Sequence, residues 1–286
     1  MSYKRFGLMI LTSTVVMFIL MYINTYAWEH IFYSETRTYM AILMGATMAV
    51  IMLAYMLGMY SSKKLNIAIF AGSIVVFAVA LWLVRSQVTV SGPSYMRAMI
   101  PHHSIAIMTS ERAQIRDPRV RKLADEIIEA QRREIAEMRY LIAEVSSDDV
   151  VESIYQDPPA APGNVEDALS NTLISQLDLA PMAEAEADQV LDAEAVCTFN
   201  RSPETHPVFW TGQDLSDAAM KLNGVLVPLD GTGETADGGI VFEAPGATVT
   251  VDPLGEDADW RSDAELVFEL EQGLTVGYRG FWSCAG

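Results

Sequence analysis

Methionine and histidine side chains gather in one short stretch of the sequence. Together they make up 20 of the 286 residues, yet five lie within the 13 residues from 96 to 108. Thioether sulfur and imidazole nitrogen are donors that soft metal ions prefer, and the combination suits Cu(I) better than zinc or nickel. The stretch therefore predicts a copper site, a binding function without catalytic turnover. Its donors are Met96, Met99, His102, His103 and Met108.

A helix would bring most of these donors to one side. At 3.6 residues per turn, four of them share about one third of the helix circumference, and Met108 falls outside that sector. Pro101 separates the Met pair from the His pair and removes a backbone hydrogen bond, so we expect a kink there. One or both histidines would bind the ion.

A second amphipathic helix is predicted from Asp117 to about Glu144, with Asp117 as the N-cap. Its apolar stripe has heptad-like spacing, includes Met138 and is interrupted by Gln131 and Glu134. Burying such polar groups costs about 1–3 kcal/mol each unless they have partners, so we expect them to orient the ligating imidazoles. A two-helix hairpin cannot enclose a core, which predicts a homodimer that forms a four-helix bundle.

These two motifs resemble a known bacterial family. Met-Arg-Ala-Met-Ile-Pro-His-His-Ser-Ile-Ala-Ile-Met and Leu-Ala-Asp-Glu-Ile-Ile-Glu-Ala-Gln-Arg-Arg-Glu-Ile-Ala-Glu-Met are similar to the family catalogued as domain of unknown function 305. The resemblance covers about residues 92–145. It implies a ferritin-like helical bundle and, for some members, periplasmic copper binding and copper tolerance. The ligands it implies are Met96, Met99, His102, His103, Met108 and Met138.

Three apolar runs predict transmembrane helices. Phe6–Ile23, Tyr39–Tyr60 and Leu65–Val84 lack charged residues and are 18, 22 and 20 residues long, close to the ~20 that a helix needs to cross a bilayer. The first run could instead belong to a signal peptide comprising residues 1–27, because Thr25 and Ala27 satisfy the small-residue rule for cleavage. In either case the chain is anchored in a membrane.

Basic residues set the expected orientation. Lys4 and Arg5 precede the first run, and Lys63 and Lys64 separate the second from the third. Basic residues favour the cytoplasmic side. We therefore expect a bacterial inner-membrane protein with a cytoplasmic N-terminus and residues 85–286 in the periplasm.

The second apolar run also carries methionines at four-residue spacing. A methionine stripe of this kind is either a helix-packing seam or a sulfur-lined contact for copper. Its members are Met40, Met44, Met48, Met52 and Met56, followed by Met59.

Charge divides the chain into regions. Residues 1–90, the predicted three-helix membrane region, carry a net charge of +4, and residues 91–145, the hairpin, carry +1. The remaining −23 belongs to an acidic Pro/Ala linker at 146–195, with one possible helix near Val165–Leu179, and an acidic domain at 196–286. Nucleic-acid binding is excluded because no basic cluster stands apart from acidic residues.

The acidic domain is predicted to be all-β, a small sandwich or barrel. Cys197 and Cys284 lie near its two ends, and in an oxidising compartment they would form a disulfide. A metal site of these cysteines with His206 is an alternative, although the spacing matches no familiar pattern. The segments Cys197–Trp210 and Val276–Cys284 resemble small periplasmic β domains to which no activity is attached. The expected strands are Gly224–Pro228, Gly239–Phe242, Ala247–Val251, Ala264–Leu270 and Leu274–Tyr278, separated by Gly, Pro and Asp turns.

Other functions fit the sequence less well than copper binding. A di-iron enzyme needs bridging carboxylates and a Glu-x-x-His spacing, which neither His102 nor His103 has. Hydrolysis could use Ser104 or Ser110, but no nucleophile elbow accompanies them. A structural module that couples the membrane helices to the acidic domain, without metal, is the alternative function. For the copper function, the expected partners are membrane lipid, a second copy of the chain and a copper-donor or copper-acceptor protein.

Overall fold

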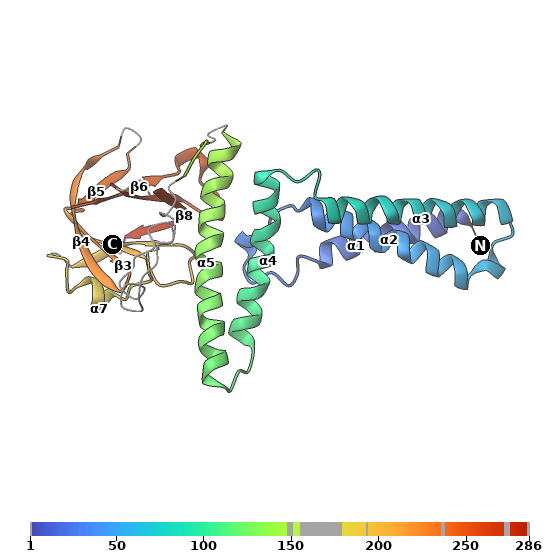
Figure 1. Cartoon of the computed structure of the whole chain (residues 1–286), viewed down its shortest axis with the longest axis horizontal. Coiled ribbons are helices and arrows are strands. Elements are labelled where there is room, and N and C mark those ends of the chain that lie inside the picture. The colour runs from blue at the N-terminus through green and yellow to red at the C-terminus, as the bar shows by residue number, and fades with distance from the viewer. Residues whose placement is uncertain are drawn as a thin grey trace, which may run out of the picture. The chain divides into compact units, whose positions relative to one another are not determined.

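The structure, a computed structural model, describes residues 2–147, 151–154, 179–192, 194–235, 238–271 and 275–284. The chain divides into two compact units, Met1–Gln131 and Arg132–Gly286. The first unit is helical, and the second combines the end of a long helix with a β domain (Figure 1).

Three apolar helices begin the first unit. They are α1 (Tyr3–Leu20), α2 (Glu35–Tyr55) and α3 (Lys63–Ser86), and each is long and apolar enough to cross a membrane. The side chain of Ser34 caps α2 by accepting the Arg37 N–H, and Ser62 caps α3 in the same way. The short 3-10 helix η1 (Trp28–His30) lies between α1 and α2, and η2 (Leu57–Met59) follows α2.

Helix α2 uses small residues where it packs. Its buried positions are Ala41, Gly45, Ala46, Ala49 and Leu53. A Cβ added to Gly45 would lie 2.3 Å from Thr14 Oγ1, so the absence of a side chain lets α1 and α2 approach closely.

The methionine stripe lies outside this buried set. Met40 and Met59 are exposed, and the four methionines between them are half-buried. Met52 and Met56 pack against the cluster that contains Phe6, Leu53 and Tyr60. These two methionines thus contribute to helix packing.

Two further helices follow, joined at residues 113–117, where the sequence predicts the turn of a hairpin. They are α4 (Gly92–Arg112) and α5 (Pro118–Ser146), and Arg121 Nη1 donates a 3.0 Å hydrogen bond to the Ser110 carbonyl across the turn. Asp117 accepts the backbone N–H of Arg119 at 2.9 Å, the expected N-cap contact. The side chain of Arg119 also donates to Asp117, and this hydrogen bond lowers the pKa of Asp117. Helix α4 is continuous through Pro101.

The second unit contains a closed barrel of eight antiparallel strands. Each strand pairs with the next along the chain, and β1 pairs with β8. The prediction of a sandwich or barrel is thereby resolved as a barrel, in which no strand of the sheet is left with an unpaired edge. The strands are β1 (Ala195–Asn200), β2 (Phe209–Gly212), β3 (Asp217–Leu222), β4 (Val225–Glu234), β5 (Ile240–Ala244), β6 (Ala247–Pro253), β7 (Ala264–Leu270) and β8 (Thr275–Cys284).

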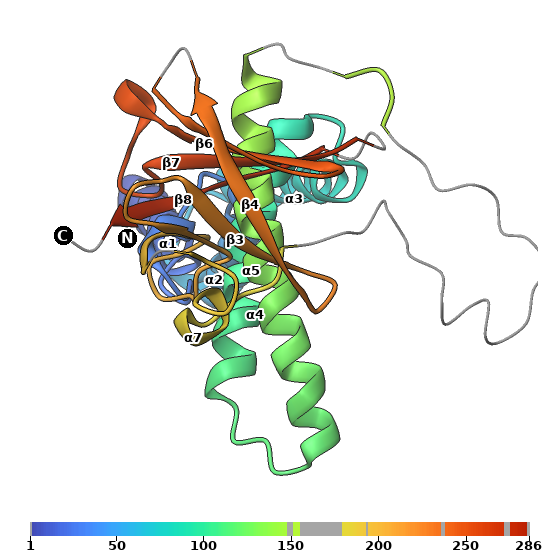
Figure 2. The same ribbon diagram turned by 90° about the vertical axis from the view of Figure 1, so that its left-hand side faces the viewer.

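Aromatic side chains fill the barrel. Along β1, β6 and β7 buried residues alternate with half-buried ones, as expected when one face of each strand points inward. Figure 2 shows β4 crossing β6 and β7 obliquely in projection, which fits the tilt that closure of a barrel requires. The largest fully buried side chains of this interior are Phe199, Phe209, Phe242, Phe268 and Tyr278.

Part of the expected linker instead packs on the barrel. Leu179 is completely buried and forms a β-bridge with Leu222, and the Met182 N–H donates to the Pro207 carbonyl at 2.8 Å. Helix α7 (Glu184–Ala187) follows, where Glu186 pairs with Lys221 at 2.7 Å and this hydrogen bond lowers the pKa of Glu186. Residues 179–191 therefore belong to the barrel domain, because their apolar side chains cover one part of it. The rest of the helix predicted near Val165–Leu179 lies outside the described residues.

The second half of α5 also belongs to the barrel unit. Ala136 is fully buried in the core cluster of this unit. A Cβ on Gly277 of β8 would lie 2.5 Å from ring carbons of Tyr140, so glycine at this position lets the tyrosine ring lie flat against the strand. Arg139 Nη1 donates to the Arg261 carbonyl at 3.0 Å.

The predicted disulfide is present. Cys197 and Cys284 are bonded and face each other in the β1–β8 pairing that closes the barrel, 87 residues apart in sequence. The cross-link therefore joins the first and last strands of the barrel.

Reduction of this bridge should destabilise the barrel. Closing a loop of this length restricts the unfolded chain, so we expect a loss of about 2–4 kcal/mol in the free energy of unfolding. Thermal unfolding of the full chain in detergent, followed by tryptophan fluorescence with and without reductant, measures the loss. The Cys197→Ser/Cys284→Ser variant should have the melting temperature of the reduced protein, and reductant should not change it. An identical melt of the parent protein in both conditions would contradict the expectation.

Candidate functional site

The candidate ligands on α4 differ in how deeply they are buried. Met96 and His103 are buried, together with Ile100 and Ile107 on the same helical face. Met99 lies beside this face and is half-buried, whereas His102 is exposed. The five donors that the sequence groups together thus meet different surroundings.

The ring of His103 is held in one orientation. Its Nδ1 lies 2.8 Å from the carbonyl oxygen of Met99. A carbonyl oxygen can only accept, so Nδ1 carries the proton, and in the neutral ring the lone pair is on Nε2. The Met99 carbonyl thereby orients this ring. The orienting role of Gln131 and Glu134 stays a prediction.

The two histidine rings lie close but differ in environment. Their centroids are 6.2 Å apart and their planes are inclined by 80°. Because consecutive helical residues point about 100° apart, His102 faces outward when His103 is buried. His102 is therefore the more accessible of the two histidines.

Met108 belongs to another face of α4. It lies one helical turn beyond Ser104, a fully buried residue. Ser104 Oγ accepts the Tyr26 N–H at 2.8 Å and lies 2.9 Å from Nδ1 of His30. The segment between α1 and α2 therefore covers this side of α4.

His30 is a buried histidine outside the predicted site residues. It is only 3% exposed and ends η1. The short Ser104–His30 distance resembles a nucleophile and its base, but Ser104 has no exposed surface and already accepts a backbone N–H. We interpret the pair as a structural contact. Its signal in the sequence is the single histidine in Trp28-Glu-His30, and the contact itself spans 74 residues.

The candidate residues of α5 fall in both units. Gln131 is the last residue of the first unit and is half-buried. Glu134 and Met138 are half-buried in the part of α5 that belongs to the second unit. Within the residues that the structure describes, no three His, Cys, Asp or Glu side chains gather in a way that could hold a metal ion. Methionine is not among those residue types.

The alternative site in the C-terminal domain is wrong. Cys197 and Cys284 are joined to each other, so neither offers a thiolate, and His206 is exposed. Trp210 donates its indole N–H to the Met182 carbonyl at 3.0 Å, and Trp282 packs against the core. Trp260 is 54% exposed beneath the guanidinium of Arg261. The tryptophans thus act in packing and at the surface.

Replacement of Ser104 tests how the α1–α2 segment is held. Ser104→Ala removes one hydrogen-bond partner from the Tyr26 N–H and one from His30, so we expect the free energy of unfolding to fall by about 1–3 kcal/mol. Thermal unfolding in detergent gives the loss, and hydrogen exchange should become faster at residues 24–33. Ser110→Ala, a half-buried serine on the same helix, is the matched control. Equal melts and equal exchange for the two variants would contradict the assignment.

Comparison with known proteins leaves the activity open. The family model described as a domain of unknown function, DUF6692, matches residues 143–286. Uncharacterized protein L153 of Acanthamoeba polyphaga mimivirus is 32% identical over 108 residues, which cover 37% of this chain and 69% of the viral protein. No solved structure matches the chain. Because the family model covers half of its residues, the chain belongs to the DUF6692 family.

Proposed function

We propose that the protein is a membrane-anchored copper-binding protein that holds the metal on α4 without catalytic turnover. The observation that carries the proposal is the hydrogen bond from His103 Nδ1 to the Met99 carbonyl. Ligating histidines commonly donate one ring N–H to such an acceptor, which orients the ring and leaves the other nitrogen for the metal. The resemblance of residues 92–145 to domain of unknown function 305 supports the same function.

Helical spacing ranks the proposed ligands. Met99 and His103 are four residues apart, so their side chains can reach one ion from the same helix. Met96 lies seven residues from His103, about 10 Å along the axis. This distance favours a contact of Met96 beside Met99 over direct ligation of the ion that Met99 and His103 would share. His102 would receive copper from solvent or from a partner protein. Met108 and Met138 would contribute only if the metal moved or a second ion bound.

The proposed location follows from charge and redox chemistry. Lys4, Arg5, Lys63 and Lys64 favour a cytoplasmic N-terminus, and three crossings would leave residues 85–286 in the periplasm. The Cys197–Cys284 disulfide suits that oxidising compartment. A C-terminal reporter that is active only in the periplasm checks the sidedness.

The α4–α5 hairpin is proposed to dimerise. Val120, Leu123 and Ile127 of α5 follow heptad-like spacing and are 48%, 56% and 36% exposed. An apolar stripe on a water-exposed helix favours a partner, and a second copy of the same hairpin would complete a four-helix bundle.

Light scattering of the full chain in detergent should therefore give the mass of a dimer after the micelle is subtracted. Leu123→Glu/Ile127→Lys should shift the protein to monomer because it places charge in the proposed interface. Val225→Lys, at an exposed apolar residue of the barrel, is the control and should leave the mass unchanged. A monomeric parent protein well above micromolar concentration would exclude the dimer.

Anaerobic Cu(I) competition titration of the full chain in detergent tests the copper site. Met99→Leu/His103→Ala should weaken Cu(I) binding by more than about tenfold, since even the loss of an orienting partner costs that much. Met17→Leu/His206→Ala removes the same residue types from a half-buried position of α1 and an exposed position of the barrel domain, and it should bind like the parent protein.

The alternative, a structural module without metal, predicts another result. It is favoured by the second half of α5, which packs on the barrel through Ala136 and Tyr140. If the parent and both variants bind Cu(I) equally weakly, and Cu(I) leaves the melting temperature unchanged, the copper proposal fails and this module remains.

A further inference from the structure

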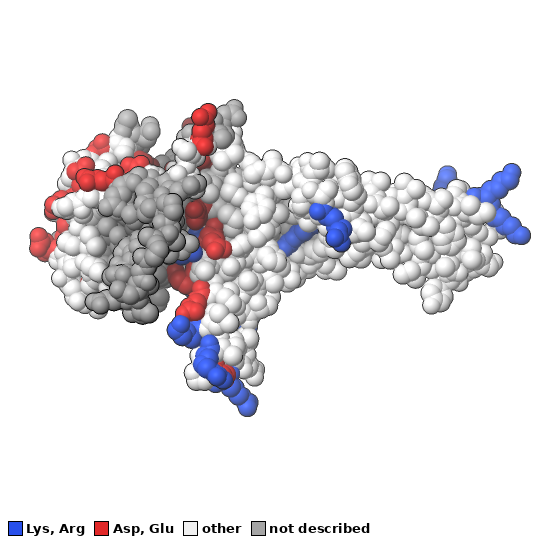
Figure 3. Space-filling view, viewed as in Figure 1, with Lys and Arg blue, Asp and Glu red and all other residues white. Residues whose placement is uncertain are grey.

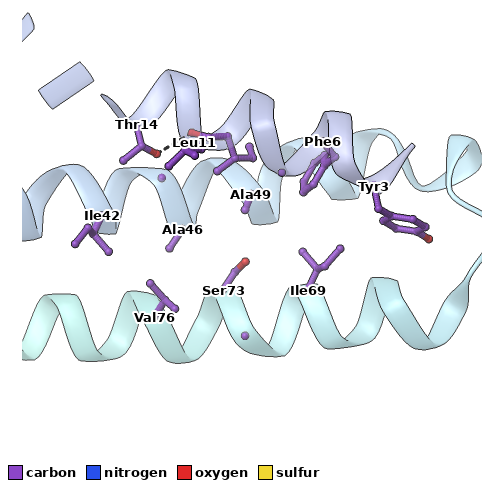
Figure 4. A pocket seen from close by; sticks show the side chains of 14 residues that line it. Tyr3, Phe6, Leu11, Thr14, Ile42, Ala46, Ala49, Ile69, Ser73 and Val76 are labelled. Carbon is purple, nitrogen blue, oxygen red and sulfur yellow. Dashed lines mark hydrogen bonds between the residues drawn. The ribbon is translucent and has the colours of Figure 1, made fainter. Parts of the chain in front are cut away.

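A groove opens on one side of the three apolar helices. It has a volume of about 570 Å³ and runs between α1 and α3 over α2. In Figure 4, Phe6 and Leu11 point into it from α1, and Ile69, Ser73 and Val76 point into it from α3. The groove is thus apolar over nearly all of its length.

Small residues form its floor. Gly45, Ala46 and Ala49 of α2 line the groove, and they leave room between the larger side chains of α1 and α3. The hydroxyl of Thr14 donates a hydrogen bond to the Ile10 carbonyl at 2.9 Å, so it needs no hydrogen-bond partner from a molecule in the groove. The space accepts a long, flexible and apolar group.

The groove has the depth of one lipid leaflet. On α1 its lining extends from Tyr3 to Thr14, which at 1.5 Å per residue is about 16 Å. The hydrocarbon core of a bilayer is about 30 Å thick, so a single leaflet contributes about 15 Å. The groove begins at the N-terminal end of α1 and stops near the middle of the membrane that these helices would cross.

Basic side chains surround the end where the groove begins. Tyr3 Oη donates to Asn66 Oδ1 at 2.8 Å, which holds the start of α1 against the start of α3. Lys4 and Arg5 follow Tyr3, and Lys63 and Lys64 begin α3; all four side chains are exposed. Figure 3 shows basic atoms without acidic ones at this end. The sequence has no acidic residue in positions 1–28 or 36–110.

We propose that this groove binds an anionic phospholipid, with one acyl chain over the α2 floor and the phosphate between the two basic pairs. Depth and charge support the same occupant, because the apolar part matches one leaflet and the cations lie where a headgroup would lie. Juxtamembrane Lys and Arg residues attract anionic lipids, and a tyrosine at the interface suits the same depth. The inference rests on membrane insertion of α1–α3 and is independent of the copper proposal.

Thermal unfolding of the full chain in detergent, with added phosphatidylglycerol or phosphatidylcholine of identical acyl chains, tests the site. Phosphatidylglycerol should raise the melting temperature more than phosphatidylcholine, because a ligand that binds the native state stabilises it. Lys63→Gln/Lys64→Gln should lower the preference for phosphatidylglycerol by about tenfold or more in apparent affinity. Arg85→Gln, at the opposite end of α3, should retain the preference.

A variant that fills the groove provides a second test of the proposal. A Cβ on Gly72 meets no atom within 4 Å, so Gly72→Leu can fold and place its side chain in the space that the acyl chain would use. It should abolish the response to both lipids. Ala78→Leu, an exposed position of α3 outside the groove lining, should respond like the parent protein.

Four outcomes would overturn the proposal. Equal shifts with the two lipids would remove the role of the basic residues, and a normal response of Gly72→Leu would place the lipid elsewhere. If inorganic phosphate alone reproduced the stabilisation, the basic side chains would form a site for a soluble anion and not for a lipid headgroup. Conversion of a dimer to a monomer by Gly72→Leu, with no lipid response in the parent protein, would instead assign the groove to a second copy of the chain.

Discussion

Backbone N–H and C=O groups must be paired wherever water cannot reach them, and both units are solutions to that requirement. Helices α1, α2 and α3 satisfy their backbone internally, which is what a segment in hydrocarbon needs. The barrel satisfies its own by pairing β1 with β8, so every strand has two neighbours. Side chains then determine what each closed framework can do.

Features set by local pattern are those that the sequence predicts best. The three apolar helices, the Asp117 cap, five strands and the Cys197–Cys284 bridge all follow from composition, spacing or end position. Strands β1, β2 and β3 are not predicted, and the reason is identifiable for two of them. β2 has only four residues, and the Asp-Ala-Ala-Met-Lys-Leu of β3 has no strand alternation and contains good helix formers. Pairing with neighbouring strands overrides those preferences.

Features that depend on contacts distant in sequence escape prediction. His30 contacts Ser104, 74 residues away in sequence, and the residues Trp28-Glu-His30 do not indicate this partner. Residues 179–191 look like linker because they are rich in Ala and Glu, yet Leu179 and Met182 find apolar surface on the barrel. The candidate copper residues illustrate the same limit, since periodicity places Met96 and His103 on one face but says nothing of burial. The hydrogen bond to the Met99 carbonyl, which decides the tautomer of His103, is a matter of geometry.

The position of the disulfide also has a mechanical consequence. The chain enters the barrel at β1, so a pull on the preceding residues would first detach the segment at 179–191 and then begin to peel β1 away from its neighbours. Peeling from Ala195 meets the cross-link at Cys197 after two residues. From there tension passes into a covalent bond with β8, and the barrel resists as one body instead of opening strand by strand. The barrel thereby withstands a pull that would otherwise break the hydrogen bonds between its strands one at a time.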